Sequence, residues 1–348
     1  MKLAPFVYKE MLHVLRDKRM LFVALAIPIV QMLLFGFAIS TEVNNINVAV
    51  AYDRYDEDVR QAIERMSSNP YVTLKGQIDN TQVYPTLQRG AADAAVVFRD
   101  GSDVQIVADA SNPNIAQSST GYLQAMILGD SGGTAGNIDT HFLYNPQLKS
   151  SYNFAPGIMG MLFMLVCALM TAVSVVREKE TGTMELLLVS PVRPIQIIIS
   201  KMVPFFVLSC VDLALMLGIA RWLLDVPMSA GVLPVILFSL LYILLSLGLG
   251  LLVSTISTSQ IMAMLICGMV MIMPVVMLSG LIFPVDNLPV VLKQISFIVP
   301  ARWYIDAMRK LMVEGLDIGM VLDDLLILAV MTVILLAVAI RNFKIRLS

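Results

Sequence analysis

The chain has 348 residues, of which 57% are hydrophobic and only 14% are charged, and its formal net charge is −2. Soluble globular proteins carry about 25% charged residues, so this composition excludes an ordinary soluble fold. The hydrophobic surplus indicates a protein that lies mostly within a lipid bilayer.

Residues 1–19 mix apolar positions such as Phe6, Val7 and Leu15 with cationic ones such as Lys9 and Arg16. This pattern is typical of an amphipathic helix that lies at the membrane interface with its basic face toward anionic headgroups. The alternative is a frayed terminal segment.

Six apolar runs are each long enough to cross a hydrocarbon core about 30 Å thick. The first run is longer than the apolar part of a signal peptide, and no A-x-A-like site follows it, so we interpret it as a retained anchor. The sequence predicts transmembrane helices at residues 20–40, 154–176, 202–224, 232–256, 261–283 and 320–340.

Residues 41–152, between the first two predicted spans, have the pattern of a small soluble domain. Strands and helices mostly alternate there, which predicts an α/β domain or an α+β arrangement of the same elements. The expected strands are at 46–52, 71–74, 94–98 and 104–107, and the expected helices are around 59–66, 84–89 and 115–128.

Two observations limit the chemistry of the chain. The insert holds 13 acidic and 7 basic residues, a net charge of −6, which disfavours nucleic acid as a partner. The three cysteines, Cys167, Cys210 and Cys267, fall in three different predicted spans, and the sequence has no G-x-x-x-x-G-K-[ST] motif. We therefore expect no metal, no cofactor and no enzymatic site on this chain, so a separate subunit or an ion gradient must drive any active transport.

The Lys and Arg residues predict the orientation. The short segments on one side of the six spans hold many more of them than those on the other, and such segments face the cytoplasm. Both termini are therefore expected inside and the insert outside. The inner cations are Lys2, Lys9, Arg16, Lys18, Arg19, Arg177, Lys179, Arg193, Lys201, Arg341, Lys344 and Arg346, and the outer ones are Arg221, Lys293, Arg302, Arg309 and Lys310.

A short charged segment, REKETGTMELLLVSPVRP at residues 177–194, connects the second and third predicted spans. Gly182 permits a turn, Thr183 can cap a following helix, and Glu185 lies in the first turn, where the helix dipole favours a carboxylate. Pro191 ends the element. The pattern predicts a small helix on the membrane surface, and the alternative is an ordinary loop.

This segment resembles the cytoplasmic signature of ABC-2 type permeases, the membrane subunits of bacterial ABC exporters, and the resemblance to drug-exporter-like members covers nearly the whole chain. It implies that residues 1–19 form an elbow helix beside a coupling helix that docks on an ABC ATPase subunit. That subunit would hold ATP and Mg, and a second permease copy or a homologous permease would complete the pathway in the inner membrane. The residues implied in coupling are Arg177, Glu178, Glu180, Gly182, Thr183, Glu185 and Pro191.

Asp212 is a carboxylate in the middle of the third predicted span. Burial there is costly, so the side chain should face the bundle interior, a partner or water. It is either a contact for cargo or a cation on the pathway, or a protonated or hydrogen-bonded packing group, for example with Ser209.

Beyond the fifth span, prolines at 284, 289 and 300 divide the stretch around 284–315 into two helices too short to span the membrane. Their apolar character and the aromatic pair at 303–304 suggest re-entrant or interfacial packing. The resemblance implies that they cap the translocation path as outer gate helices, and the alternative is an interfacial loop. The residues expected in this gate are Gly280, Pro284, Pro300 and Trp303.

The sequence therefore predicts an α-helical membrane protein with six transmembrane helices, an N-terminal interfacial helix and an α/β extracytoplasmic domain. The expected function is the permease subunit of an ATP-driven exporter that moves a hydrophobic or amphiphilic substrate, drug-like or lipidic, and that contacts membrane lipids. The alternatives are a membrane-anchored ligand-binding sensor or assembly protein, and an ABC-2 permease for sodium or polysaccharide. The expected divisions are residues 1–19, 20–40, 41–152 and 153–348.

Overall fold

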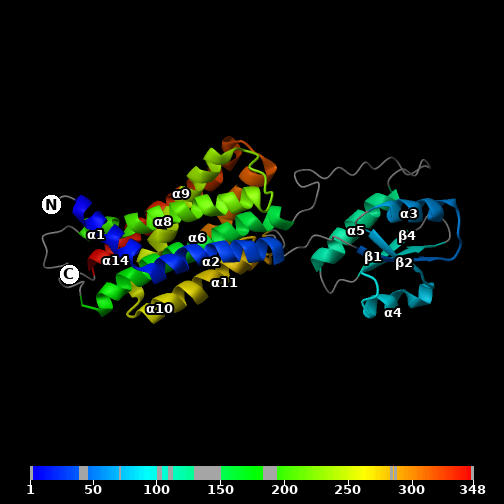
Figure 1. The fold of residues 1–348 in the computed structure, drawn as a ribbon, viewed down its shortest axis with the longest axis horizontal. Coiled ribbons are helices and arrows are strands. Elements are labelled where there is room, and N and C mark those ends of the chain that lie inside the picture. The colour runs from blue at the N-terminus through cyan, green and yellow to red at the C-terminus, as the bar shows by residue number, and fades with distance from the viewer. Residues whose placement is uncertain are drawn as a thin grey trace. The chain divides into compact units, whose positions relative to one another are not determined.

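The structure, a computed structural model, describes residues 3–38, 46–69, 72–99, 104–108, 113–128, 150–182, 194–282, 285 and 288–345. The chain forms two compact units. Residues Met1–Ile39 and Ser151–Ser348 make a helical unit, and residues Ser40–Ser150 make an insert domain (Figure 1).

The insert domain is built on a four-stranded sheet with the order β2-β1-β3-β4. β1 pairs in parallel with both β2 and β3, whereas β4 is antiparallel to β3. The strands are β1 (Ile46–Tyr52), β2 (Val72–Gln77), β3 (Ala94–Phe98) and β4 (Val104–Ala108), and the helices are α3 (Glu57–Ser68), α4 (Val83–Gln88, preceded by η1, Asn80–Gln82) and α5 (Pro113–Leu128). The prediction of an α/β domain is therefore confirmed.

Both faces of this sheet are buried, because alternate residues of β1 contribute to two different cores. Val48 and Val50 pack with α3 and α5, whereas Ala49 and Ala51 pack with α4. Figure 1 shows α3 and α5 on one side of the sheet and α4 on the other. The long near-continuous apolar run of β1 follows from this double burial.

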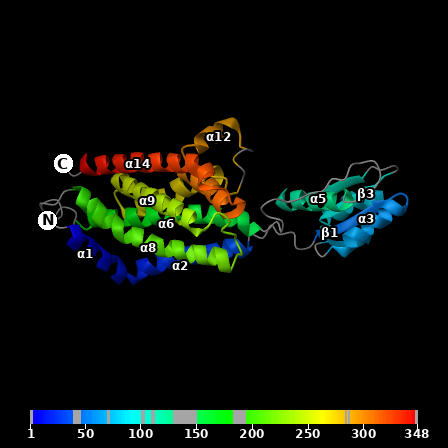
Figure 2. The ribbon, with the colours of Figure 1, turned by 90° about the horizontal axis from the view of Figure 1, so that it is seen from above.

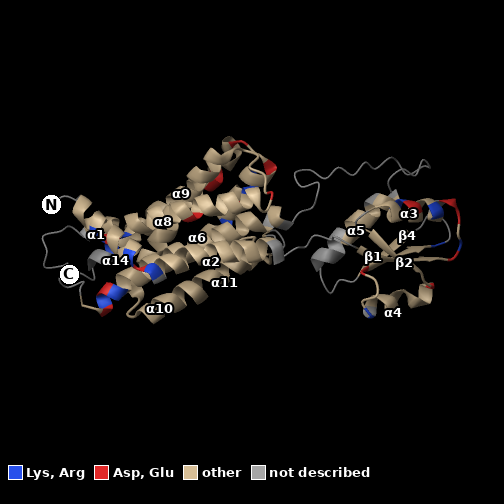
Figure 3. Ribbon diagram, viewed as in Figure 1, with Lys and Arg blue, Asp and Glu red and all other residues tan. Residues whose placement is uncertain are grey.

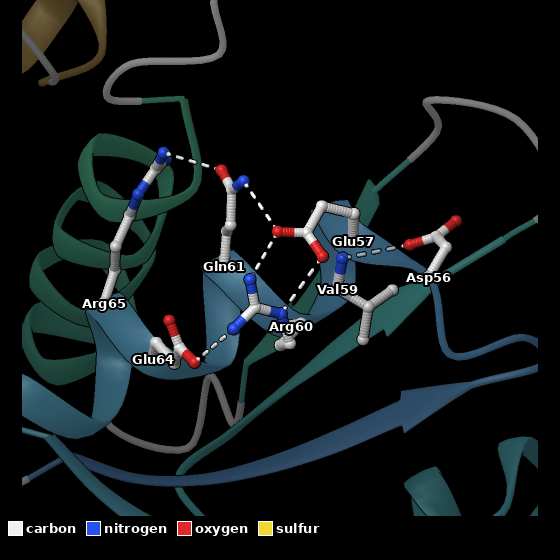
Figure 4. A network of polar contacts seen from close by, with 7 residues as sticks. All are labelled: Asp56, Glu57, Val59, Arg60, Gln61, Glu64 and Arg65. Carbon is white, nitrogen blue, oxygen red and sulfur yellow. Dashed lines mark hydrogen bonds and ion pairs between the residues drawn. The ribbon is translucent and has the colours of Figure 1, made fainter.

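α3 begins where Asp56 accepts a hydrogen bond from the backbone N–H of Val59, the usual way of capping a helix start. Along its exposed face, Arg60 pairs with Glu57 and Glu64 (Figure 4). Hydrogen bonds from Arg60 and, to a smaller extent, from Gln61 hold the pKa of the Glu57 carboxyl below its ordinary value. Ion pairs this exposed contribute little to stability.

The helical unit contains five helices that are long and apolar enough to cross a membrane, or six if the bent pair α1 and α2 counts as one span, among the residues that the structure describes. The bend between α1 and α2 is 67°. The elements are α1 (Leu3–Arg16), α2 (Lys18–Ala38), α6 (Ser150–Glu180), α8 (Pro194–Trp222), α9 (Val232–Ile256), α10 (Gln260–Leu265), η2 (Ile266–Met271), α11 (Ile272–Leu278), α12 (Val290–Ser296), α13 (Pro300–Arg309), η4 (Lys310–Glu314), η5 (Ile318–Val321) and α14 (Leu322–Ile345). The prediction of a helical membrane protein is confirmed.

The helices of this unit pack closely. α14 runs along α9, and α1 and α2 lie against α8 (Figure 2). A Cβ atom on Gly250 of α9 would lie 2.4 Å from the carbonyl oxygen of Ala168 in α6, so only glycine permits this approach. Most of the length of these helices is free of charge, and Lys, Arg, Asp and Glu gather toward their ends (Figure 3).

Several element boundaries differ from the prediction, and α8, for example, begins at Pro194 rather than at residue 202. α6 continues through Arg177 and ends only at Glu180, because the helix extends past its apolar part as a charged final turn. The fifth span contains a π-helical segment, η2, and ends at Leu278 rather than at residue 283. Gly280 follows in the left-handed region with φ +83°, a conformation that terminates helices.

Candidate functional site

Lys201 of α8 is the centre of a buried cluster at the end of the bundle where α1, α6 and α8 meet. Its side chain is only 2% exposed, and its Nζ lies 2.5 Å from Oε1 of Glu178 and 3.6 Å from Oε2 of Glu10. Glu10 also pairs with Lys9 at 3.0 Å. We call Lys201, Glu10 and Glu178 the Lys201 cluster. It joins the three helices α1, α6 and α8.

A second contact lies beside this cluster, where Arg177 Nη1 is 3.3 Å from Oδ2 of Asp17. Asp17 lies between α1 and α2 and accepts a hydrogen bond from the backbone N–H of Met20 at 3.1 Å. The hydrogen bond from the Met20 N–H holds the pKa of the Asp17 carboxyl below its ordinary value, although partial burial acts in the opposite direction. The Arg177 guanidinium also lowers this pKa. A charged Asp17 therefore caps α2 and links it to α6.

The last turn of α6 contacts α9 and α10. Lys179 donates a hydrogen bond to the carbonyl oxygen of Ser254, and the Glu180 carboxylate accepts hydrogen bonds from the backbone N–H and the side-chain amide of Gln260. Arg177, Glu178 and Glu180, all expected to couple to an ATPase, are thus engaged within the chain. These contacts fix the end of α6, from which the chain continues into the segment after Gly182.

Gly182 follows α6 with a φ of +70°, in the left-handed region, so the backbone turns where the sequence predicted. Thr183, Glu185 and Pro191 lie outside the described residues. The predicted coupling helix therefore stays a prediction, whereas its anchor on α6 is described.

Asp212 is 3% exposed, and its Oδ1 has no hydrogen-bond partner among the described residues. The suggested partner Ser209 instead contacts the Cys167 sulfur, with Oγ and Sγ 3.1 Å apart. This contact joins α8 to α6. An ionised carboxylate without partners is costly to bury, so the choice between a packing role and contact with cargo stays a prediction.

At the opposite end of the bundle, Gly280 is held by Arg309, whose Nη2 donates to the Gly280 carbonyl oxygen at 2.5 Å. Pro300 lies in the first turn of α13, where its missing N–H is not needed. Trp303 Nε1 donates to the carbonyl oxygen of Phe297 at 3.1 Å, which links α13 to the end of α12. Pro284 lies outside the described residues. The gate role of these residues stays a prediction.

α13 is fixed to the bundle by an aromatic pair that the sequence analysis did not identify. The rings of Tyr304 and Tyr242 stack with centroids 4.1 Å apart. The Tyr304 hydroxyl contacts Ser239 Oγ at 2.9 Å, and the Tyr242 hydroxyl donates to the Gly160 carbonyl oxygen at 3.0 Å. Hydroxyl-bearing residues in the middle of the fourth apolar run were the available signal.

The Lys201 cluster was also missed. The lysine was treated only as one of the inner cations, although Glu10 in the N-terminal helix, on the same predicted side of the membrane, could have suggested an ion pair.

A further ion pair joins η4 to α14, because Lys310 lies 2.7 Å from Asp306 and 2.9 Å from the buried Asp324. Within the described part of the chain, no three His, Cys, Asp or Glu side chains come together as a metal site would require.

Residues 18–341 match the profile of the ABC-2 family transporter proteins, and the chain belongs to this family. It is accordingly a multi-pass membrane protein and the permease subunit of an ABC transporter, whose ATPase is a separate subunit.

Relatives from Escherichia coli K12 match most of the chain. YbhR, described as a probable multidrug ABC transporter permease, is 29% identical over 357 residues and is covered over 95% of both chains. YbhS, described in the same words, is 26% identical over 343 residues, which make up 92% of this chain and 91% of the relative. The inner membrane transport permease YhhJ is 24% identical over 258 residues, or 70% of this chain and 67% of its own length.

Proposed function

We propose that this permease exports a hydrophobic or amphiphilic compound, drug-like or lipidic, across the cytoplasmic membrane. The observation that carries the proposal is the match, over more than nine-tenths of both chains, to two relatives described as probable multidrug permeases. A permease for sodium or polysaccharide is the alternative that the test below separates.

Two cavities in the helical unit support an amphiphilic cargo. One, of about 350 Å³, is lined only by apolar side chains of α8, α9 and α14. The other, of about 660 Å³, lies between α8 and α9 and combines an apolar lining with Arg221 and Trp222. Apolar walls with a few polar groups are typical of sites for amphiphilic small molecules.

The proposed orientation places both termini and the Lys201 cluster in the cytoplasm and the insert domain outside, as the distribution of Lys and Arg favours. In this orientation the segment after Gly182 faces the ATPase. Arg177, Glu178 and Glu180 then act as positioning residues, because they fix the end of α6 against the junction of α1 and α2, α8 and α10 respectively. Movement of the ATPase would reach these parts of the bundle through the end of α6.

A second permease copy or a homologous permease would cover the exposed apolar face of the fifth span. Ile261, Met269 and Met273 are 71%, 67% and 64% exposed. Such a face is compatible with lipid as well as with another helix, since no hydrophobic driving force separates the two within a bilayer. The pathway would form between the two permeases.

The test is reconstitution of the tagged chain, together with the ATPase that copurifies with it, in proteoliposomes. We expect ethidium and a fluorescent phospholipid to stimulate ATP hydrolysis and to cross the membrane only when ATP is hydrolysed. Sodium chloride and a soluble polysaccharide serve as controls for the alternative. Stimulation by either of these without an effect of the amphiphiles, or the absence of an ATPase from the purified complex, would refute the proposal.

A further inference from the structure

The insert domain contains a cavity of about 250 Å³ at one edge of its sheet. Asp53 comes directly after β1, and Arg99 comes directly after β3, so both line it from the carboxyl ends of two parallel strands. The full lining is Asp53, Asn80, Val83, Tyr84, Val97, Arg99, Gln105 and Val107.

The topology of the sheet makes this edge a natural binding position. From β1 the chain passes through α3 to β2 on one side, and it then returns through α4 to β3 on the other side of β1. α3 and α4 cover opposite faces. The strand order therefore reverses between β1 and β3, and in open α/β sheets ligands bind at the carboxyl ends of the strands at such a switch point.

The two charged groups in the cavity are each oriented by an amide. Asn80 Nδ2 donates to Oδ1 of Asp53 at 2.6 Å, and Arg99 Nη2 donates to Oε1 of Gln105 at 2.7 Å. Each contact leaves further hydrogen-bonding capacity, on the second carboxylate oxygen and on the remaining guanidinium N–H groups. Among the described residues, neither charge takes part in an ion pair with the other or with a third residue.

The rest of the lining separates an apolar floor from an aromatic rim. Val83 and Val97 are buried and Val107 is partly buried, whereas Tyr84 is 65% exposed. The cavity volume lies just below the range of about 300–1,000 Å³ for drug-sized ligands, so its occupant is small. A negative group, a positive group and an apolar floor within this volume match a compound that carries both charges and a short apolar body.

We propose that this cavity binds a small zwitterion of the size of a free α-amino acid. The ammonium group of the ligand lies at Asp53, its carboxylate lies at Arg99, and its apolar side chain covers the valines. Arg pairs with carboxylates through directional, charge-assisted hydrogen bonds, which sets the orientation of the ligand. The site is independent of the exported cargo and gives the insert domain a ligand of its own.

The first experiment uses the unmodified, purified full-length chain in detergent. Isothermal titration is carried out with L-alanine, L-leucine and L-phenylalanine, which span the range of sizes that the cavity can accept. Two analogues of leucine each lack one charge: L-leucinamide lacks the carboxylate, and 4-methylpentanoate lacks the ammonium group. We expect at least one amino acid to bind, and each analogue of leucine to bind at least about tenfold more weakly than leucine, because each loses a charge-assisted contact.

The second experiment removes the two charges of the protein one at a time. Asp53→Asn should weaken the binding of leucine and leucinamide without further weakening the binding of 4-methylpentanoate. Arg99→Gln should weaken the binding of leucine and 4-methylpentanoate without further weakening the binding of leucinamide. Glu64→Gln and Arg60→Gln, on the exposed face of α3, are matched controls that should leave binding unchanged.

Two outcomes on the unmodified chain would overturn the proposal: none of the three amino acids binds, or the analogues bind as well as leucine. A third is leucine binding that survives both Asp53→Asn and Arg99→Gln. Binding of only leucinamide or only 4-methylpentanoate would identify a simple cation or anion site instead.

Discussion

At the scale of single residues, Gly250 determines how closely α6 and α9 approach. In Gly250→Ala the new Cβ would meet the Ala168 carbonyl oxygen at 2.4 Å and the Thr171 side chain at 2.8 Å, so the helices must separate. We expect a destabilisation of about 1–3 kcal/mol, as for other overpacked sites. Thermal unfolding in detergent measures it. Gly268→Ala, where a Cβ meets nothing within 4 Å, is the matched control, and equal effects of the two changes would contradict the prediction.

Asp212 is tested by an amide replacement, which removes the charge and keeps the shape. We expect a packing role for this buried carboxyl, so Asp212→Asn should leave both the amount of folded protein and export close to those of the unmodified chain. Export by reconstituted vesicles and thermal stability are measured together. Asp323→Asn, at an exposed carboxyl, controls for the loss of an acid. Normal stability with export lost for some substrates and not for others would instead assign Asp212 to the pathway.

At the scale of elements, the Lys201 cluster should hold α1, α6 and α8 together. Lys201→Met removes the cation beside Glu178, which is 18% exposed, whereas Glu10 keeps its pair with Lys9. We therefore expect a loss below the value of about 3–5 kcal/mol that breaking a fully buried pair costs. The double variant Lys201→Met/Glu178→Gln should recover part of this loss, because one uncompensated charge is then removed. Thermal unfolding of the single and double variants measures the coupling, and strictly additive losses would show that the two side chains do not interact.

The helices and strands themselves were largely predictable from the sequence. β1 and β3 were expected at their observed bounds, and α9 was expected at residues 232–256, because the patterns that specify them are local. The partners of the charged residues were not predictable. Glu10 lies far from Glu178 and Lys201 in the chain. In the sequence, Arg177 and Glu178 resemble exposed loop residues, and only the folded helices bring Asp17 and Lys201 beside them.

At the scale of the whole molecule, the orientation can be tested with cysteine labelling. Ser67 and Thr181 are exposed, one in the insert domain and the other just after α6. Ser67→Cys should react with an impermeant thiol reagent in intact spheroplasts, whereas Thr181→Cys should react only after the membrane is opened. Background is low because Cys167 and Cys267 are buried and Cys210 is partly buried. Labelling of both positions from outside would contradict the proposed topology.

The π-helical segment η2 has a geometric consequence for the fifth span. Ala263, Cys267, Met271 and Val275 are all buried, and they recur at every fourth residue. On a regular α-helix such a series would wind around the axis by about 40° per step, because a turn takes 3.6 residues. The wider turns of η2 counteract this drift, which accounts for the burial of all four residues along the span. A periodicity of four within a long apolar run is therefore a signature by which a π-helical segment can be sought in a sequence before its structure is known.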